Sequence, residues 1–242
     1  MVITLRSLAF IIFFAISSVL YAIPISILGR IAPFSIIARM GKHWGLVNLR
    51  ALEIICGLGY RVQGMENLPD RSSIVLCKHQ STWETIALRA LLPPENTWVV
   101  KRELLFIPFF GWALAAFQPI SLNRSSARQS IRKLLDEGTY WLDRGRSLVI
   151  FPEGTRVSPG ETKRYGQGGA MIAQKTGCPV VPIAHNAGIF WGRRDIKKYP
   201  GKIDLVIGKP IDPNGLTSGE INRRIQLWIE ETVGNLPNRR VN

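Results

Sequence analysis

The chain has few cysteines, and those it has are scattered. Cys56, Cys77 and Cys178 are an odd number in 242 residues and form no C-x-x-C motif. A disulfide framework and a thiolate metal site both need paired or clustered cysteines, so the sequence favours neither. This cysteine usage fits a reducing compartment.

Acidic residues are also scarce. Seventeen Asp and Glu stand against 31 Lys and Arg, which gives a formal net charge of +14 and a pI near 10.3. So basic a chain indicates an anionic partner, which is nucleic acid, a phosphorylated substrate or the surface of an anionic bilayer.

Charge is missing altogether from Ser7 to Leu28, a run of 22 residues. This run is long enough to span a bilayer as a helix, and a nucleic-acid-binding module has no use for it. A cleaved signal peptide is disfavoured, because the run exceeds the usual apolar core and Leu20 stands where a small residue is wanted.

Two interpretations of this N-terminal run stay open, a spanning helix and a segment lying in the membrane interface. Pro24 and the further apolar stretch 31–38 favour a bent, partly embedded helical pair. The basic residues that follow would then lie near anionic head groups on the cytoplasmic side. They are Arg30, Arg39, Lys42 and Arg50.

After about residue 60 short apolar runs alternate with helical periods, which predicts an α/β domain. We expect a membrane-associated helical segment over residues 1–58 and the α/β domain over 59–242. Strands are predicted at 73–77, 97–100, 119–122, 147–151, 180–184 and 203–207. Helices are predicted at 83–92, 126–144, 169–176 and 219–233.

One segment breaks this alternation. Residues 104–117 are 14 uncharged residues interrupted by Pro108 and Gly111, too few to cross a membrane. The segment is either a buried core element or a surface that faces lipid or lines an acyl chain, and the neighbouring basic residues favour the surface.

His79 is the first candidate for chemistry, because it follows the predicted strand 73–77 and open α/β sheets place reactive groups at that edge. A lone histidine is more often structural, but Glu84 lies five positions on. A carboxylate that binds one ring nitrogen fixes the tautomer and leaves the other nitrogen as a base. Ser81 and Glu84 also match the S-x-x-E capping box, so Glu84 is predicted both to cap a helix and to pair with His79.

The segment FPEGTR, residues 151–156, is the second candidate. Gly154 allows a tight turn, Thr155 offers a donor, and Arg156 can bind a phosphate or carboxylate with a fork of hydrogen bonds. Taken alone, the segment is an ordinary surface loop. Lys101 and Arg124 also lie at or beyond strand ends, where solvated cations are common.

Several sequence blocks together are far more specific than any one of them. KHQSTWE, KRELLFIPFFGW, ISLNRSSA, FPEGTR and VPIAHNAG occur in this order over about 110 residues. This pattern resembles the glycerolipid acyltransferase family, in particular bacterial 1-acylglycerol-3-phosphate acyltransferases, over residues 73–188. The family's first motif is H-x-x-x-x-D, so Glu84 stands where Asp is usual.

The resemblance implies a mixed sheet flanked by helices and an acyl transfer reaction. A fatty acyl group would pass from acyl-CoA or acyl carrier protein to the sn-2 hydroxyl of 1-acyl-glycerol-3-phosphate, giving phosphatidic acid in phospholipid synthesis. His79 would be the general base, oriented by Glu84. The substrate-binding residues that the resemblance implies are Lys101, Arg124, Glu153, Gly154, Thr155 and Arg156.

No metal and no resident cofactor are expected, because the thiolate leaving group is good and the thioester is a co-substrate. His185, in VPIAHNAG, is a rival base without a carboxylate at a comparable spacing. The resemblance implies a bacterial inner membrane location with the active site on the cytoplasmic face. Lysophosphatidic acid, anionic head groups and an acyl carrier protein are the candidate partners, and nucleic acid is not one.

Two other kinds of function remain open. The chemistry could serve a different acceptor, which is glycerol 3-phosphate or another lysolipid. Alternatively, the protein could be a non-catalytic binder of anionic membranes that keeps the motifs only as parts of its fold.

Overall fold

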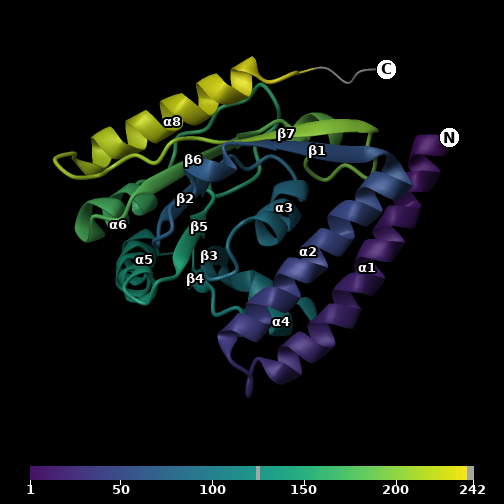
Figure 1. Cartoon of the computed structure of the whole chain (residues 1–242), viewed down its shortest axis with the longest axis horizontal. Coiled ribbons are helices and arrows are strands. Elements are labelled where there is room, and N and C mark those ends of the chain that lie inside the picture. The colour runs from purple at the N-terminus through teal and green to yellow at the C-terminus, as the bar shows by residue number, and fades with distance from the viewer. Residues whose placement is uncertain (124–125, 239–242) are drawn as a thin grey trace.

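The structure is a computed structural model that describes residues 1–123 and 126–238. Its centre is a seven-stranded sheet in the order β1-β7-β6-β2-β5-β3-β4, with helices on both faces (Figure 1). β1 and β7 run opposite to the other five strands, which confirms the mixed sheet. The strands are β1 (Leu58–Gln63), β2 (Ile74–Cys77), β3 (Asn96–Lys101), β4 (Ile120–Leu122), β5 (Ser147–Ile150), β6 (Val180–His185) and β7 (Gly201–Ile207).

The helices cover the sheet in two layers. One layer holds α2 and α3, and the other holds α5, α6 and α8. The helical elements are α1 (Val2–Leu28), α2 (Phe34–Cys56), η1 (Met65–Asn67), α3 (Trp83–Leu91), η2 (Arg102–Phe106), α4 (Phe110–Ala116), α5 (Ala127–Leu142), α6 (Gly168–Thr176), α7 (Ala187–Phe190) and α8 (Ser218–Asn235).

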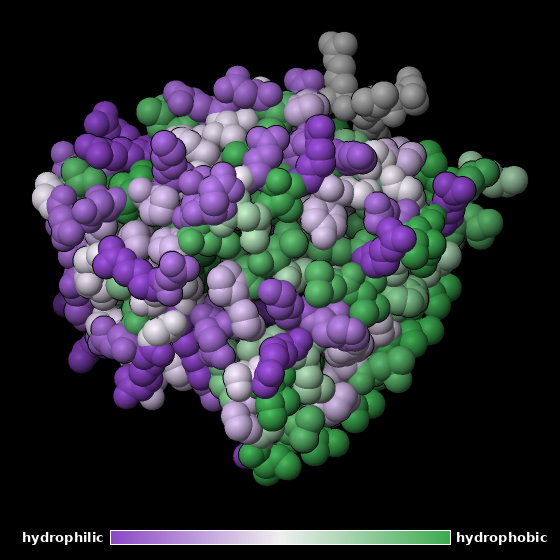
Figure 2. Space-filling model, viewed as in Figure 1, coloured by the Kyte–Doolittle hydropathy of each residue, from purple (hydrophilic) through white to green (hydrophobic). Residues whose placement is uncertain are grey.

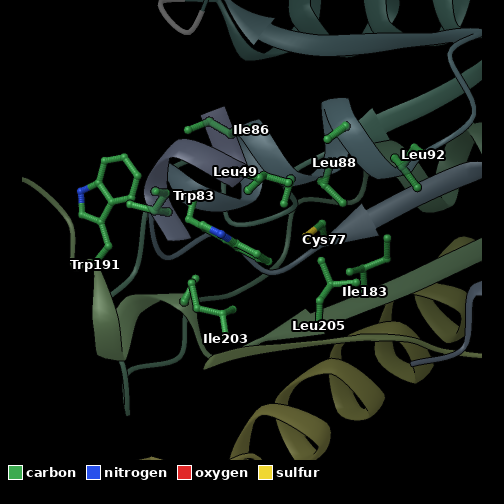
Figure 3. Packing of buried hydrophobic residues seen from close by; sticks show 14 of the residues in the cluster. Leu49, Cys77, Trp83, Ile86, Leu88, Leu92, Ile183, Trp191, Ile203 and Leu205 are labelled. Carbon is green, nitrogen blue, oxygen red and sulfur yellow. The ribbon is translucent and has the colours of Figure 1, made fainter. Parts of the chain in front are cut away.

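β2 is fully buried and contributes to both layers. Val75 and Cys77 face the cluster around α2 and α3, while Ile74 and Leu76 face the cluster around α5, α6 and α8. This division follows from the two-residue period of a strand. In the first cluster Trp83 lies between the helices and the strands (Figure 3). The continuous apolar run that predicted β2 is therefore the signature of a strand covered on both faces.

All six predicted strands and all four predicted helices are present. The strand that sequence patterns missed is β1, LGYRVQ, which lies at the edge of the sheet and pairs with β7. An edge strand is half exposed, so its sequence lacks the apolar run that marks the central strands.

The two N-terminal helices lie side by side along one edge of the molecule (Figure 1). α1 is long and apolar enough to cross a membrane, judged by length and composition alone. It continues as a helix through Pro24, and the chain turns between α1 and α2 at residues 29–33, so the two helices form the expected pair. Phe10, Leu49 and Leu52 belong to the same core as the strands, so the helical pair packs on the sheet domain.

The apolar segment 104–117 forms most of η2 and α4 and is not a buried core element. Phe106 is 71% exposed and Trp112 57% exposed. Leu104, Ala113 and Phe117 instead line a cavity. The segment is thus an exposed apolar surface on one side and a cavity wall on the other.

The strand order places the two motif loops beside each other. β2 and β5 are parallel neighbours, so the loops that follow them leave the sheet at the same edge. The loop after β2 leads to α3 in one layer, whereas the loop after β5 leads to α6 in the other. Adjacent loops that diverge to opposite faces open a crevice at the carboxyl ends of the strands, which is where open α/β sheets bind ligands.

Candidate active site

His79 and Glu84 form a hydrogen-bonded pair in this crevice, as the sequence predicted. Nδ1 of His79 lies 2.7 Å from Oε1 of Glu84. The Glu84 side chain is fully buried, whereas that of His79 is 15% exposed and lines the cavity. The His79 ring stacks on Phe151 at a centroid distance of 4.0 Å, so its orientation is fixed on both its edge and its face.

Glu84 also binds the start of α3, but not through the expected capping box. Its carboxylate accepts the backbone N–H of Gln80 at 2.9 Å and of Ser81 at 2.8 Å. In a capping box the serine hydroxyl would also accept the N–H of Glu84, but here Ser81 Oγ accepts the N–H of Trp83. The helix begins one residue later than the pattern implied, with Thr82 as its N-cap.

The protonation states follow from these contacts. Burial acts to raise the pKa of Glu84, but His185, the His79 hydrogen bond and the Ser81 N–H outweigh it and hold that pKa below its usual range. Glu84 is therefore ionised at neutral pH and can only accept, so the proton of a neutral His79 ring sits on Nδ1. Nε2 has no hydrogen-bond partner among residues 1–123 and 126–238 and is free to act as a base.

The loop after β5 is locked onto the backbone of His79. The Val157 N–H donates to the His79 carbonyl at 2.8 Å, and the His79 N–H donates to Oε1 of Glu153 at 3.3 Å. His79 is thus held through its ring, its N–H and its carbonyl. Together these contacts position FPEGTR against KHQSTWE.

The Glu153 carboxylate points into the protein. Its side chain has no exposed surface, and Oε1 lies 3.6 Å from the Nζ of Lys78. Burial raises the pKa of Glu153 to about 7, against the opposing effects of backbone donors and Lys78. The family resemblance implied a substrate contact for this residue, but the carboxylate faces the loop after β2 and not the cavity.

A cavity of about 700 Å³ begins at His79 and extends into both helical layers. Apolar side chains of α1, α2 and α4 line one part of it, and those of α5 line another. Among the described lining residues three are cations, Arg89, Lys101 and Arg156, and none is acidic. An apolar space with fixed cations suits an amphipathic anion.

The three cations differ in their surroundings. Lys101 is half exposed at the end of β3 and lies 3.1 Å from Glu103. Arg156 follows the turn at Gly154, where φ is +66°, and its Nε is buried without a hydrogen-bond partner among the described residues. Burial lowers the pKa of Arg156. Thr155 is partly exposed in the same turn, and Arg124 lies outside the described residues.

Arg89 is a cavity residue that no sequence pattern singled out. Its guanidinium lies between the rings of Trp98 and Phe117 and donates to Asn96 at 3.1 Å. Burial lowers the pKa of Arg89 to about 9, so the group is charged at neutral pH. Sequence patterns did not indicate a role for Arg89, because a lone arginine in an apolar helix is most often a surface residue.

His185 lies close to Glu84, despite the large separation in sequence, with 3.9 Å between Nε2 and Oε2. Both of its ring nitrogens are engaged. Nε2–H donates to the Lys78 carbonyl at 2.8 Å, and Nδ1 accepts the Ala187 N–H at 3.2 Å. Burial lowers the pKa of His185. A fully buried ring with both nitrogens bonded has no free nitrogen to take a substrate proton, so His79 is the better base.

No three His, Cys, Asp or Glu side chains gather to hold a metal ion within residues 1–123 and 126–238. The sequence model of the acyltransferase family matches residues 59–186, which span the whole crevice. The chain belongs to the acyltransferase family.

Curated relatives of this acyltransferase include the 1-acyl-sn-glycerol-3-phosphate acyltransferase of Pseudomonas aeruginosa. It is 39% identical over 198 residues, which are 81% of this chain and 77% of the relative. The enzyme of the same name from Saccharomyces cerevisiae is 33% identical over 189 residues, 76% of this chain and 62% of the relative.

The fold of this acyltransferase is also that of a solved structure. The crystal structure of the 1-acyl-sn-glycerophosphate (LPA) acyltransferase PlsC from Thermotoga maritima matches with a TM-score of 0.80. The match covers 98% of this chain and 97% of that chain, at 24% identity. It therefore includes the N-terminal helices as well as the sheet domain.

We expect Glu84→Gln to lower the free energy of unfolding by about 2 kcal/mol at neutral pH, because buried donors lose a charged acceptor. Since the pKa of Glu84 in the folded protein lies below its ordinary value of about 4.3, this contribution is complete above that pH. It is lost as the pH falls through the folded pKa.

Chemical unfolding of detergent-solubilised wild type and variant across pH would measure this difference. Glu66→Gln, which changes an exposed carboxylate, serves as the control and should leave stability unchanged. If the free energies of unfolding of wild type and Glu84→Gln differ by the same amount at neutral pH and at about pH 3, the charge of Glu84 is not the stabilising feature.

Proposed function

We propose that the protein transfers a fatty acyl group from a thioester, acyl-CoA or acyl carrier protein, to the sn-2 hydroxyl of 1-acyl-glycerol-3-phosphate. The product is phosphatidic acid. The observation that carries this proposal is the His79–Glu84 pair at the mouth of an apolar cavity whose charged lining residues, within the described part of the chain, are all cations. The relatives from Pseudomonas aeruginosa and yeast bear the name of this reaction.

In the proposed reaction Nε2 of His79 takes the proton of the acceptor hydroxyl as its oxygen attacks the thioester carbonyl. Glu84 stabilises the imidazolium that forms. The tetrahedral intermediate collapses, the carbon–sulfur bond breaks, and the imidazolium returns its proton to the thiolate. General base catalysis of this kind contributes about 10²–10⁴ to the rate.

The acceptor's phosphate would be bound by arginine and lysine. Arg156 has a buried Nε without a partner among the described residues, and it lines the same cavity as His79. A phosphate oxygen can satisfy that donor and the neighbouring amino groups together. Lys101 and Arg124 remain proposed contributors, with Arg124 named from the sequence motif, and Gly154 and Thr155 shape the turn.

A mass-spectrometric assay of the purified protein with a panel of lysolipids and both donor types would test the reaction. We expect phosphatidic acid from 1-acyl-glycerol-3-phosphate, and a loss of about 10²–10⁴ in rate for His79→Ala. His43→Ala, which changes an exposed histidine on α2, is the matched control. Turnover of His79→Ala within about tenfold of wild type would remove the general base assignment, and an inactive wild type would favour the non-catalytic alternative.

Arg156→Gln distinguishes acceptors with and without a phosphate. If the acceptor is phosphorylated, the KM for it should rise by at least about tenfold, since a charge-assisted fork of hydrogen bonds is lost. Arg164→Gln, which changes an exposed arginine, is the control. An unchanged KM would favour a lysolipid without phosphate, such as a lyso-ornithine lipid.

We also propose that α1, α2 and α4 seat the enzyme in one leaflet. α1 packs along its length on the rest of the protein, from Ser7, which accepts the Lys198 N–H, to Ile25. One side of α1 is buried against the protein, and its outer, exposed face can lie in the membrane interface. That face is a continuous apolar band along the edge occupied by α1 (Figures 1 and 2). As the family resemblance implies, we place the enzyme at the bacterial inner membrane with the site on the cytoplasmic side.

The triple substitution Ile12→Glu, Ile16→Glu and Leu20→Glu places charge on this band at exposed positions. We expect binding to vesicles that contain anionic lipid to fall by more than about tenfold, because each charge must leave water. Ile196→Glu with Leu227→Glu changes two other exposed apolar residues and is the control. Unchanged cosedimentation of the triple variant would rule out the proposed membrane face.

A further inference from the structure

A buried ionic cluster lies beneath His79. The Nζ of Lys78 lies 2.7 and 2.9 Å from the two carboxylate oxygens of Glu230 on α8, and 3.6 Å from Oε1 of Glu153. The Tyr165 hydroxyl donates to Glu230 at 2.9 Å. The Lys78 side chain is 1% exposed. The cluster therefore joins the loops after β2 and β5 to the last helix of the chain.

Stability alone does not account for this cluster. Lysine is among the residues least often buried, and a buried ion pair is commonly no more stabilising than apolar side chains of the same volume. Glu230 also lies outside the part of the chain that matches the acyltransferase family. Its proximity to the site is a property of this chain that the family motifs do not supply.

Lys78 is linked to the reacting group at both ends. Its backbone precedes His79, and its carbonyl accepts the Nε2–H of His185 at 2.8 Å. Its ammonium group reaches Glu153, the residue that accepts the His79 N–H. Glu153 is thus placed between a cation at 3.6 Å and the backbone donor of the base at 3.3 Å.

We propose that Glu230 is a positioning residue for acyl transfer, which holds the Lys78 ammonium so that Glu153 keeps its hydrogen bond to the His79 backbone. This inference rests on the proposed function only for its catalytic readout. Without the charge of Glu230, Lys78 has Glu153 as its one remaining carboxylate within 4 Å among the described residues. The two would close into direct contact and draw the carboxylate away from His79.

The ionisation of Glu153 supports this view. Lys78 acts to lower the pKa of Glu153, and Glu230 acts to raise it. Removing the Glu230 charge therefore favours ionised Glu153 in contact with Lys78.

The test compares Glu230→Gln, which keeps the shape and removes the charge, with Glu231→Gln. Glu231 is the next residue on α8 and is exposed. We expect kcat of Glu230→Gln to fall about tenfold with KM for both substrates within about twofold, because a displaced base slows chemistry more than binding. Glu231→Gln should match wild type, and Glu230→Asp should recover most of the lost kcat. A wild-type kcat for Glu230→Gln, or a loss seen only in KM, would overturn the proposal.

A double-mutant cycle shows whether Glu230 acts through Lys78. In a Lys78→Met background, Glu230→Gln should cause no further loss of kcat, since the cation that it holds is gone. Additive losses would refute the route through Lys78. Tyr165→Phe removes one hydrogen bond to Glu230 and should lower kcat in the same way but less, so the proposal is still tested if Lys78→Met does not fold.

Amide hydrogen exchange separates this proposal from the proposed function. The peptide that contains His79 should exchange faster in Glu230→Gln than in Glu231→Gln, because the His79 N–H loses its acceptor. This comparison needs no turnover. An inactive wild type would therefore count against the reaction, whereas equal exchange in the two variants would count against the role of Glu230.

Discussion

The site depends on one buried carboxylate. Glu84 is inaccessible to solvent and ionised, a state that is stable inside a protein only when the charge is fully hydrogen-bonded. Its donors are the ring of His79 and the backbone of Gln80 and Ser81. The same two oxygens therefore define the turn after β2, the start of α3 and the tautomer of the base. Local folding and catalytic readiness cannot be separated at this residue.

This coupling changes what a substitution at Glu84 can reveal. An amide can still cap a helix, so Glu84→Gln would separate capping from catalysis if the two roles used different atoms. In the structure one oxygen of the Glu84 carboxylate binds both the backbone donors and the His79 ring. Glutamine at this position would therefore disturb the helix start and the base together. Glu153, which accepts the His79 N–H, and Glu230, which acts through Lys78 as proposed, bear on His79 without binding the start of α3.

Local sequence patterns predicted a large part of the fold. Central strands such as β2 are recognisable because both faces are buried. The His79–Glu84 pair was predictable because its two members are only five positions apart in the sequence. The half-exposed edge strand β1 gave no such signal. The Lys78–Glu230 pair joins residues separated by 152 positions, and Arg89 lies in the cavity because of how three elements pack around it. Contacts of this kind arise from tertiary structure and leave no periodicity in the sequence.

The shared core of the N-terminal helices and the sheet has a consequence for the geometry of the lipid reaction. Phe10 of α1 packs edge to face on Trp191, and Cys56 and Leu58 continue the same core into β1. With α1 seated in a leaflet as proposed, the height of the base above the acyl chains is set when the protein folds, without a flexible tether. An acceptor is then selected by how far its free hydroxyl stands out of the bilayer. In the proposed arrangement, the packing of α1 on the sheet domain would therefore set the position of His79 relative to the membrane surface as well as hold the protein there.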